Sequence, residues 1–246
     1  MVFISSLRYS CMHVRAFIDG MEHLAPPALA EEFDAGRIGL VIEGRGDIGQ
    51  VCCALDATLP VVRNAVMADA DMLVVHHTPL WNPITSLTGC TAGLMREILS
   101  SGMNVYVMHT NFDRTAGGVN DVLCDLLSLK NCSPLSLGAV GTCALTPDGI
   151  SRRLGGNLRV WGDLTSTGRL AVVAGSGFDL QLLAEAAALG ADAFLSAEMK
   201  HSVARAAPLP CIEATHYALE APAMKRLAER MGWQFIDDPP HLSLVP

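Results

Sequence analysis

The sequence predicts an α/β fold with two pseudo-repeated lobes, each built on a largely parallel sheet. Short apolar runs of strand type recur at residues 51–56, 72–77, 105–108, 193–197 and 211–214. Helical patterns lie between them, and strands that alternate with helices favour parallel sheets with right-handed crossovers. Residues 55–77 also resemble residues 173–198, and such internal repetition indicates duplicated units.

Helix and turn signals indicate the elements of the first half. Helices are expected at residues 14–24, 58–70, 91–100 and 117–129, and a short apolar run lies at 36–43. Pro26 and Pro27 follow the end of the first helix. Thr58 is a candidate N-cap of the second, with Pro60 in its first turn. Gly-rich residues 44–47 predict a turn.

The second half repeats this alternation after a less regular segment. Strands are expected at 170–174, 193–197 and 211–214, and helices at 178–189 and 217–231. Residues 131–157 are rich in Gly, Ser and Pro and carry only weak strand signals. The predicted organisation is an N-terminal extension at 1–11, a first repeat at 12–130, a connecting segment at 131–157 and a second repeat at 158–246.

Composition excludes several classes of function. Half of the 246 residues are hydrophobic, which is enough for a sizeable core. The formal net charge is −8 without any Lys/Arg-rich stretch, which argues against nucleic acid as the main partner. No apolar run approaches the roughly 20 residues that span a bilayer, so no membrane segment is expected. The eight cysteines form no Cys-x-x-Cys pair, which favours buried thiols in a reducing cytoplasm.

Metal-ligating residue types recur at the ends of the predicted strands. The adjacent His76 and His77 close one strand, and His109, Glu198 and His216 follow three others. Open α/β sheets bind ligands at this edge, so two related lobes would bring the site to a shared cleft between them. Imidazole with carboxylate suits Zn, Mn or Fe rather than Ca.

His76 and His77 would point to opposite faces of a regular strand. Pro79 ends the ladder abruptly, so both side chains can turn toward one cluster at the strand end. Metal ligation is the favoured interpretation of this pair over two core histidines.

Three further residues complete a candidate ligand set. Asp113 lies in an expected polar turn, where an Asp also serves as a turn or cap residue. His216 and Glu220 are four residues apart and share one helical face, although a Glu in a first turn is often only a dipole partner. With His76 and His77 they make five ligands, and five suit two ions better than one.

His109, Glu198 and His201 are candidates for catalytic roles beside that set. Each is a possible ligand, an orienting residue or a proton shuttle, with a plain polar role as the alternative. The sequence alone leaves these roles open.

The chain resembles the NIF-three-like family, whose members carry a dinuclear metal centre and are often labelled GTP cyclohydrolase 1 type 2 homologues. Motifs in family order carry this resemblance between Met12 and Gly232: Glu32-Phe33-Asp34 with Gly39-Leu40, Leu55-Asp56-Ala57-Thr58, Val75-His76-His77-Thr78-Pro79, His109-Thr110-Asn111-Phe112-Asp113, Gly117-Gly118-Val119-Asn120-Asp121, Gly190-Ala191-Asp192, Ala197-Glu198-Met199-Lys200-His201, and Thr215-His216-Tyr217 with Glu220.

The resemblance implies two intertwined α/β lobes assembled into a toroidal homohexamer. It also implies two metal ions held by the five residues of the candidate ligand set. Thr215 stands where the family commonly has Gly, and Leu219 stands where a small hydroxyl residue is common. These two departures put in doubt whether this chain takes the same substrate as the family. Residues 131–157 leave no room for the large middle insert of longer members, so the chain resembles the short form.

Two classes of function remain as hypotheses. The first is a metal-dependent hydrolase that activates water against a small, nucleotide-like or purine-like substrate suggested by the family label. The second is a non-catalytic metal-binding scaffold, metallochaperone or regulatory protein. Gly44-x-Gly46 and Gly175-x-Gly177 lack the rest of a dinucleotide or phosphate-loop pattern and are interpreted as turns.

Because the first helical pattern begins close to Met12, we expect a chain that starts at Met12 to be as stable as the full chain. Thermal unfolding of both chains tests this expectation. A large loss in melting temperature on truncation would show that residues 1–11 contribute to packing.

Overall fold

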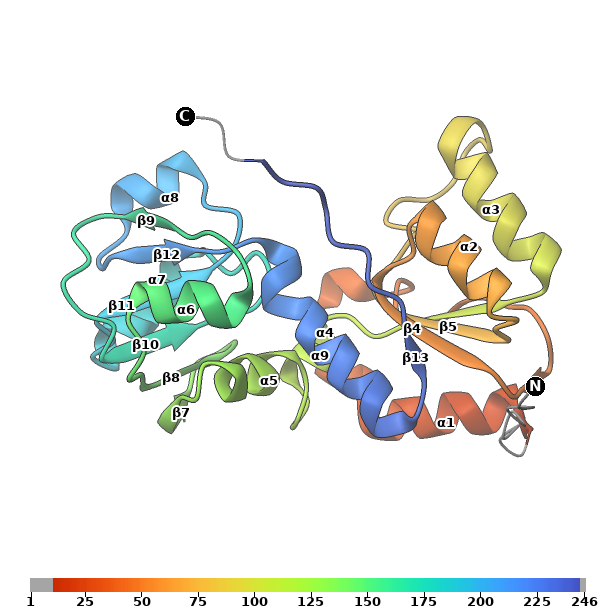
Figure 1. Ribbon diagram of the computed structural model, residues 1–246, viewed down its shortest axis with the longest axis horizontal. Coiled ribbons are helices and arrows are strands. Elements are labelled where there is room, and N and C mark those ends of the chain that lie inside the picture. The colour runs from red at the N-terminus through yellow and green to blue at the C-terminus, as the bar shows by residue number, and fades with distance from the viewer. Residues whose placement is uncertain (1–10, 244–246) are drawn as a thin grey trace, which may run out of the picture. The chain divides into compact units, whose positions relative to one another are not determined.

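The computed structural model describes residues 11–243, so residues 1–10 of the predicted extension lie outside it. The chain forms two compact units, of which the first comprises Met1–Phe112 with Met224–Pro246 and the second Asp113–Ala223 (Figure 1). Because each unit contains both a sheet and helices, the predicted α/β class is confirmed. The repeat boundaries at 130 and 158 remain a prediction, since compact units and sequence repeats are defined by different criteria.

A five-stranded sheet in the order β13-β4-β5-β6-β2 forms the centre of the first unit. Its strands are β2 (Gly39–Ile42), β4 (Val51–Asp56), β5 (Met72–His77), β6 (Asn104–Val107) and β13 (Gln234–Phe235). All pair in parallel except β2, which is antiparallel to β6. The apolar runs therefore form a sheet whose carboxyl ends lie at one edge.

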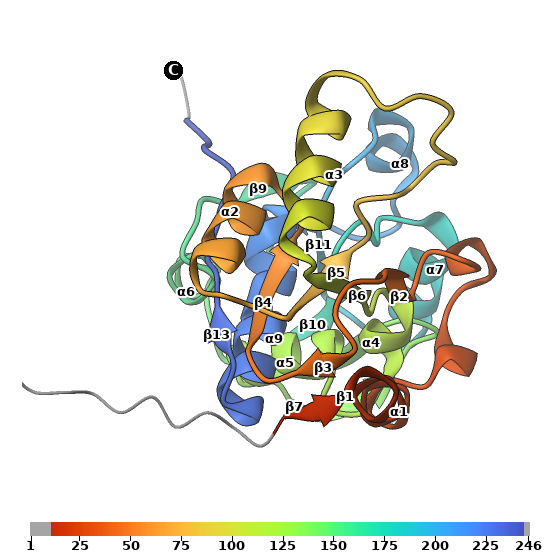
Figure 2. The ribbon, with the colours of Figure 1, turned by 90° about the vertical axis from the view of Figure 1, so that its right-hand side faces the viewer.

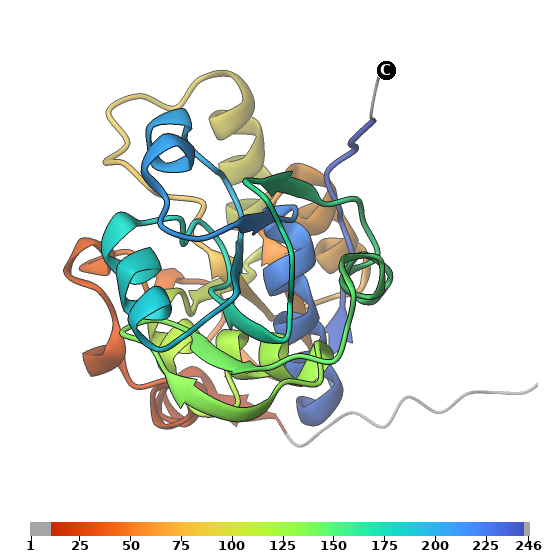
Figure 3. The same ribbon diagram turned by 90° about the vertical axis from the view of Figure 1, so that its left-hand side faces the viewer.

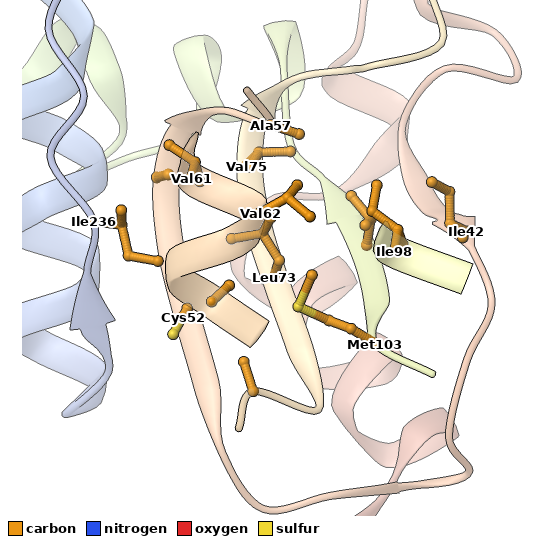
Figure 4. Packing of buried hydrophobic residues seen from close by; sticks show 14 of the residues in the cluster. Ile42, Cys52, Ala57, Val61, Val62, Leu73, Val75, Ile98, Met103 and Ile236 are labelled. Atoms are coloured by element: carbon orange, nitrogen blue, oxygen red, sulfur yellow. The ribbon is translucent and has the colours of Figure 1, made fainter. Parts of the chain in front are cut away.

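Helices cover both faces of this sheet. On one face, α2 (Leu59–Met67) and α3 (Gly89–Ser101) lie side by side (Figure 2) and pack on Cys52, Leu73 and Val75 in a buried cluster (Figure 4). On the other face lies α1 (Val14–Leu24), whose Phe17 meets Tyr106 edge to face at 6.2 Å. Because successive side chains of a strand alternate between faces, neighbouring strand residues belong to different clusters.

Capping residues lie at the ends of the helices α2 and α3, as the sequence predicts for Thr58. The hydroxyl of Thr58 accepts a hydrogen bond from the Val61 amide and caps α2, and Pro60 lies in its first turn. α3 ends at Gly102 in the left-handed conformation. Smaller elements of this unit are β1 (Met12–His13) paired with β3 (Asp47–Ile48), and the 3-10 turns η1 (Pro27–Leu29) and η2 (Glu32–Asp34).

The predicted turn at residues 44–47 is explained by a close backbone approach. A Cβ at Gly44 would lie 2.2 Å from the carbonyl oxygen of Gly102, so only glycine fits. The buried Asn104 side chain accepts from the Gly44 amide and donates to the Arg45 carbonyl. Gly44 therefore serves the turn and not a phosphate site.

A six-stranded sheet in the order β7-β8-β10-β11-β12-β9 forms the second unit. Its strands are β7 (Lys130–Pro134), β8 (Ala139–Thr142), β9 (Arg159–Trp161), β10 (Arg169–Val172), β11 (Ala193–Ser196) and β12 (Cys211–Glu213). The central strands β10, β11 and β12 are parallel, and the others pair antiparallel. Its helices are α5 (Val119–Leu126), α6 (Pro147–Leu154), α7 (Leu180–Ala188) and α8 (His201–Ala206).

The segment 131–157 is more ordered than its composition predicts. It supplies most of the β7–β8 hairpin (Figure 3) and the whole of α6. Thr146 caps α6 by accepting from the Gly149 amide, Pro147 opens the helix, and Gly155 ends it in the left-handed conformation. The strands were weak in sequence because β7 is largely exposed and gains its order from pairing with β8.

The two units share the topology of four central strands, which agrees with the predicted pseudo-repeat. In each, three parallel strands are flanked by an antiparallel strand from an earlier segment: β4, β5 and β6 with β2, and β10, β11 and β12 with β9. The lobes are intertwined in sequence, because α4 (Thr110–Arg114) and α9 (His216–Met231) each begin in one unit and end in the other.

All eight cysteines are free thiols, and five of them are buried. Burial raises the pKa of Cys52 and of Cys211 to about 11, so both remain protonated at neutral pH. Cys11, Cys90 and Cys132 are exposed, which departs from the expectation of uniformly buried thiols. Among residues 11–243, no helix combines the length and apolar character needed to cross a bilayer.

Replacement of Asp71 by Asn should lower the free energy of unfolding by roughly 1–2 kcal/mol at neutral pH. Although burial alone would raise the pKa of Asp71, hydrogen bonds from the Gln50 and Gly49 amides and from Arg45 lower it overall. This stabilisation is complete above the carboxyl pKa of the unfolded chain and is lost as the pH falls through the folded value.

Urea unfolding at pH 7 and pH 3 measures the difference between the wild-type and Asp71→Asn proteins. The difference should shrink at pH 3. Asp69→Asn removes the same charge at an exposed position nearby and serves as the control, with an expected change within about 0.5 kcal/mol. An undiminished difference at low pH would contradict the electrostatic explanation.

Candidate metal centre

The parallel strands of the first unit bring three histidines to one edge of its sheet. β5 ends at His77, which is in register with Asp56 at the end of β4. His109 follows β6 by two residues, beyond the Met108 amide that bonds to the Val75 carbonyl. The register of three neighbouring strands therefore places these side chains together at the strand ends.

His76, His77 and His109 form a cluster that could hold a metal ion. Their ligand nitrogens all lie within 4.8 Å of one another. The ring centroids are 4.8 Å apart for His76 and His77, 5.1 Å for His76 and His109, and 5.6 Å for His77 and His109. Clustered imidazole nitrogens are the preferred ligands of transition metals.

Hydrogen bonds fix which nitrogen of each ring faces the cluster. Nδ1 of His76 lies 2.8 Å from the carbonyl oxygen of Met108, and Nδ1 of His77 lies 2.7 Å from Oδ1 of Asp56. Both partners are acceptors, so each Nδ1 carries the proton and donates it. In the neutral ring Nε2 then presents a lone pair, which is the protonation state that a metal ligand requires.

His109 is held by the same device from a different segment. Its Nδ1 lies 2.8 Å from Oδ1 of Asp34, a carboxylate with 0% exposure. The other oxygen of Asp34 accepts from the amide and the hydroxyl of Thr110. These bonds satisfy both oxygens of a buried charge and lock the His109 ring.

The second unit repeats the device at His216. Nδ1 of His216 lies 2.8 Å from Oε1 of Glu198. Glu198 has a φ of 62°, a left-handed conformation that costs a non-glycine residue roughly 1–2 kcal/mol. The next amide, of Met199, donates to the buried carboxylate of Glu213 and helps to hold this strained turn. Strain of this kind is concentrated at functional sites.

His216 and Glu220 are in contact one turn apart on α9. Nε2 of His216 lies 2.9 Å from Oε2 of Glu220. With the Nδ1 proton donated to Glu198, this contact joins a nitrogen lone pair to a carboxylate oxygen. Such a contact is favourable only with a proton or a metal cation between the two atoms. The pair is therefore chemically suited to bind a cation.

A glycine loop makes room for the Glu220 carboxylate. Gly175 has a φ of +69°, and a Cβ there would lie 2.2 Å from Oε1 of Glu220 and 3.3 Å from Nε2 of His216. The hydroxyl of Ser196 donates to the Gly175 carbonyl and accepts from the Gly177 amide, which fixes the loop. The Gly175-x-Gly177 pattern was interpreted from the sequence as a turn, and the structure places this turn beside Glu220 and His216.

Asp113 lies on the short helix α4 and not in the polar turn expected from its sequence. Thr110, the first residue of α4, donates its amide to Asp34, 76 residues away in the chain, a contact that local sequence cannot reveal. The carbonyl of Asp113 accepts from the Asn120 side chain, whose oxygen accepts from the Ala174 amide. Asn120 thus ties Asp113 to the glycine loop.

His201 is placed apart from these contacts. It is the first residue of α8, is exposed, and belongs to none of the ligand clusters found among residues 11–243. Its catalytic role remains a prediction.

Sequence reasoning assigned no role to Asp34 and Asp56, which orient histidines, or to Asn120, which holds Asp113. Asp34, Asp56 and Asn120 all fall within the motifs that carried the family resemblance. The available signal was their position in those motifs, because the contacts that they make are distant in sequence or depend on the register of strands.

Comparison with known proteins shows the family to which the chain belongs. The family model of Duf34/NIF3 (NGG1p interacting factor 3) matches residues 12–238, which confirms the resemblance inferred from the motifs. A "GTP cyclohydrolase 1 type 2 homolog" of Streptomyces coelicolor is 31% identical over an alignment of 252 residues that covers 88% of this chain and 87% of the relative.

Two solved structures are similar over nearly the whole chain. Reduced HcgD from Methanocaldococcus jannaschii is 28% identical, with a TM-score of 0.78 over 92% of this chain and 97% of that chain. A Bacillus cereus protein related to NIF3 has a TM-score of 0.81 at 18% identity, over 97% and 99% of the two chains, and shows the likeness of the fold.

Replacement of Gly175 by Ala should weaken metal binding about tenfold or more, because the new methyl group displaces the Glu220 carboxylate. Gly190→Ala is the matched control, since Gly190 also has a positive φ (+76°) but a Cβ there meets only the Arg169 side chain at 3.9 Å and beyond. Both variants bear the same kind of backbone strain. Calorimetric titration with metal should show a lower affinity for Gly175→Ala than for Gly190→Ala. Equal affinities would contradict displacement of the Glu220 carboxylate as the cause.

Proposed function

Because the chain belongs to the Duf34/NIF3 family, we propose that it is a dinuclear metal-binding protein that acts as a metal-dependent hydrolase. The proposed ligands are His76 and His77 of the first unit and Asp113, His216 and Glu220 of the second. The cofactor is two divalent ions per chain, drawn from Zn, Fe and Mn.

The observation that carries this proposal is the shared orientation of the imidazoles. Each of the four rings described above donates Nδ1–H to an oxygen acceptor, and three of those acceptors are carboxylates: Asp56, Asp34 and Glu198. Carboxylate–histidine pairs of this kind fix the tautomer and raise the basicity of metal-ligating imidazoles. Four histidines with only structural roles would not all need to be held in the same tautomer, with the proton on Nδ1.

The bound ions would supply Lewis acidity and a lowered pKa for water, which suits hydrolysis. The chain's own residues would orient the ligand rings and move protons. Asp56 and Glu198 would hold the rings of His77 and His216. His109, whose Nδ1–H is held by Asp34, would accept a proton from a reacting group at Nε2.

The substrate, the assembly and the location form the finer part of the proposal. The name of the Streptomyces relative suggests a small nucleotide-like or purine-like substrate. The resemblance to the family suggests a toroidal homohexamer, and the cysteine pattern suggests a cytoplasmic location. The alternative, a non-catalytic metal scaffold or metallochaperone, differs by predicting metal transfer to an apo partner without turnover.

Elemental analysis of the purified full chain is the first test. We expect about two ions per chain in the wild-type protein and clearly fewer in His77→Ala and Glu220→Ala, because each variant loses a proposed ligand while the sheets remain intact. His23→Ala removes an exposed histidine in the last turn of α1 and should leave the metal content unchanged. Circular dichroism confirms that each variant is folded.

Unchanged metal content in both ligand variants would contradict the assignment. A wild-type value near zero that added Zn, Mn or Fe does not restore would contradict the metal centre itself. If metal binds, loss of hydrolysis in folded His76→Ala supports the enzyme, whereas metal transfer without any hydrolysis supports the scaffold.

A further inference from the structure

We propose that Phe33 and Trp81 form a binding wall for a planar nitrogen heterocycle, such as the base of a nucleotide, beside the proposed metal centre. This inference rests on the proposed function and assigns substrate recognition to residues that supply no metal ligand. Phe33 lies in η2, and Trp81 lies in the loop that follows β5.

Both aromatic rings adjoin the histidine cluster of the first unit. The Trp81 ring meets His109 edge to face, with centroids 5.3 Å apart, and the Phe33 ring lies 6.1 Å from the same imidazole. The Phe33 and Trp81 rings are 6.5 Å apart with an interplanar angle of 43°. The two rings therefore make one surface that is continuous with a proposed reacting group.

Arg37 fixes the positions of these two segments. Its guanidinium donates to the carbonyl of Trp81 at 2.7 Å and to the carbonyl of Phe33, and it lies 5.7 Å from the centre of the Trp81 ring. A guanidinium over an indole adds a cation–π attraction. The wall is thus held in place before any ligand binds, which reduces the entropy lost on binding.

Exposure of two held aromatic rings indicates a binding surface. Phe33 is 53% exposed and Trp81 is 43% exposed. Large aromatic side chains usually bury most of their area, and exposed apolar patches mark contact sites. A wall used only for folding would have no reason to present these rings to solvent next to polar imidazoles.

The chemistry of the wall favours a flat, conjugated ligand over an aliphatic chain. Aromatic side chains and a guanidinium bind nucleobases by stacking, which is tolerant of the exact base. Such a ring held against His109 would also bring an electrophilic ring carbon to the water that a metal centre activates. The wall would therefore bind the base of a nucleotide and not its phosphate.

Calorimetry with the metal-loaded full chain tests the inference, with guanosine monophosphate as the probe and ribose 5-phosphate as the base-free comparison. We expect Trp81→Ala to weaken binding of the nucleotide about tenfold, and Trp81→Phe to retain most of it because a ring remains. Affinity for ribose 5-phosphate should be the same in all three proteins. Leu87→Ala, at another exposed apolar residue between β5 and α3, should change neither affinity.

The outcomes separate this inference from the proposed function. If the nucleotide fails to bind the wild-type protein at about 1 mM, or binds Trp81→Ala unchanged, the wall is not a base site. A changed sedimentation coefficient of Trp81→Ala with unchanged nucleotide affinity would assign the wall to contact between copies of the chain. Trp81→Ala should keep its metal, so metal content reports on the proposed centre independently of the wall.

Discussion

The hydrogen bond from Nδ1 of each candidate histidine to an oxygen acceptor is the constraint on which the site depends. It fixes the ring orientation and the tautomer together, and so decides which nitrogen is left to act as a ligand. Asp34 shows the cost of this arrangement, because a fully buried carboxylate is tolerated only with its oxygens satisfied by His109 and Thr110. The orientation of the candidate ligands is thus set by the fold itself.

The duplicated topology explains why the two units offer related chemistry. In each, the carboxyl ends of parallel strands meet at one edge, and a ring and its carboxylate come from neighbouring segments at that edge: His77 with Asp56, and His216 with Glu198. The units are not equivalent. The first offers a group of imidazoles, whereas the second adds the Glu220 carboxylate and the strained turn at Glu198.

Close backbone approaches serve a turn in the first unit and a candidate ligand in the second. Gly44 and Gly175 both permit close contacts that a side chain would block, yet one serves only a backbone turn and the other borders a candidate ligand. Sequence could not separate these two glycines, because each lies in a similar Gly-x-Gly pattern. Their difference depends on what lies opposite, Gly102 in one case and Glu220 in the other.

The sequence by itself determined the α/β class, the pseudo-repeat, most of the main helices with the Thr58 cap, and the positions of His76, His77 and His109 at strand ends. Periodicity and capping are local, so they can be read from neighbouring residues. Only the tertiary structure decided that α4 forms, that Glu198 orients His216, and that Asp34 holds His109. These outcomes depend on contacts across 18 to 76 residues, which a local pattern does not encode.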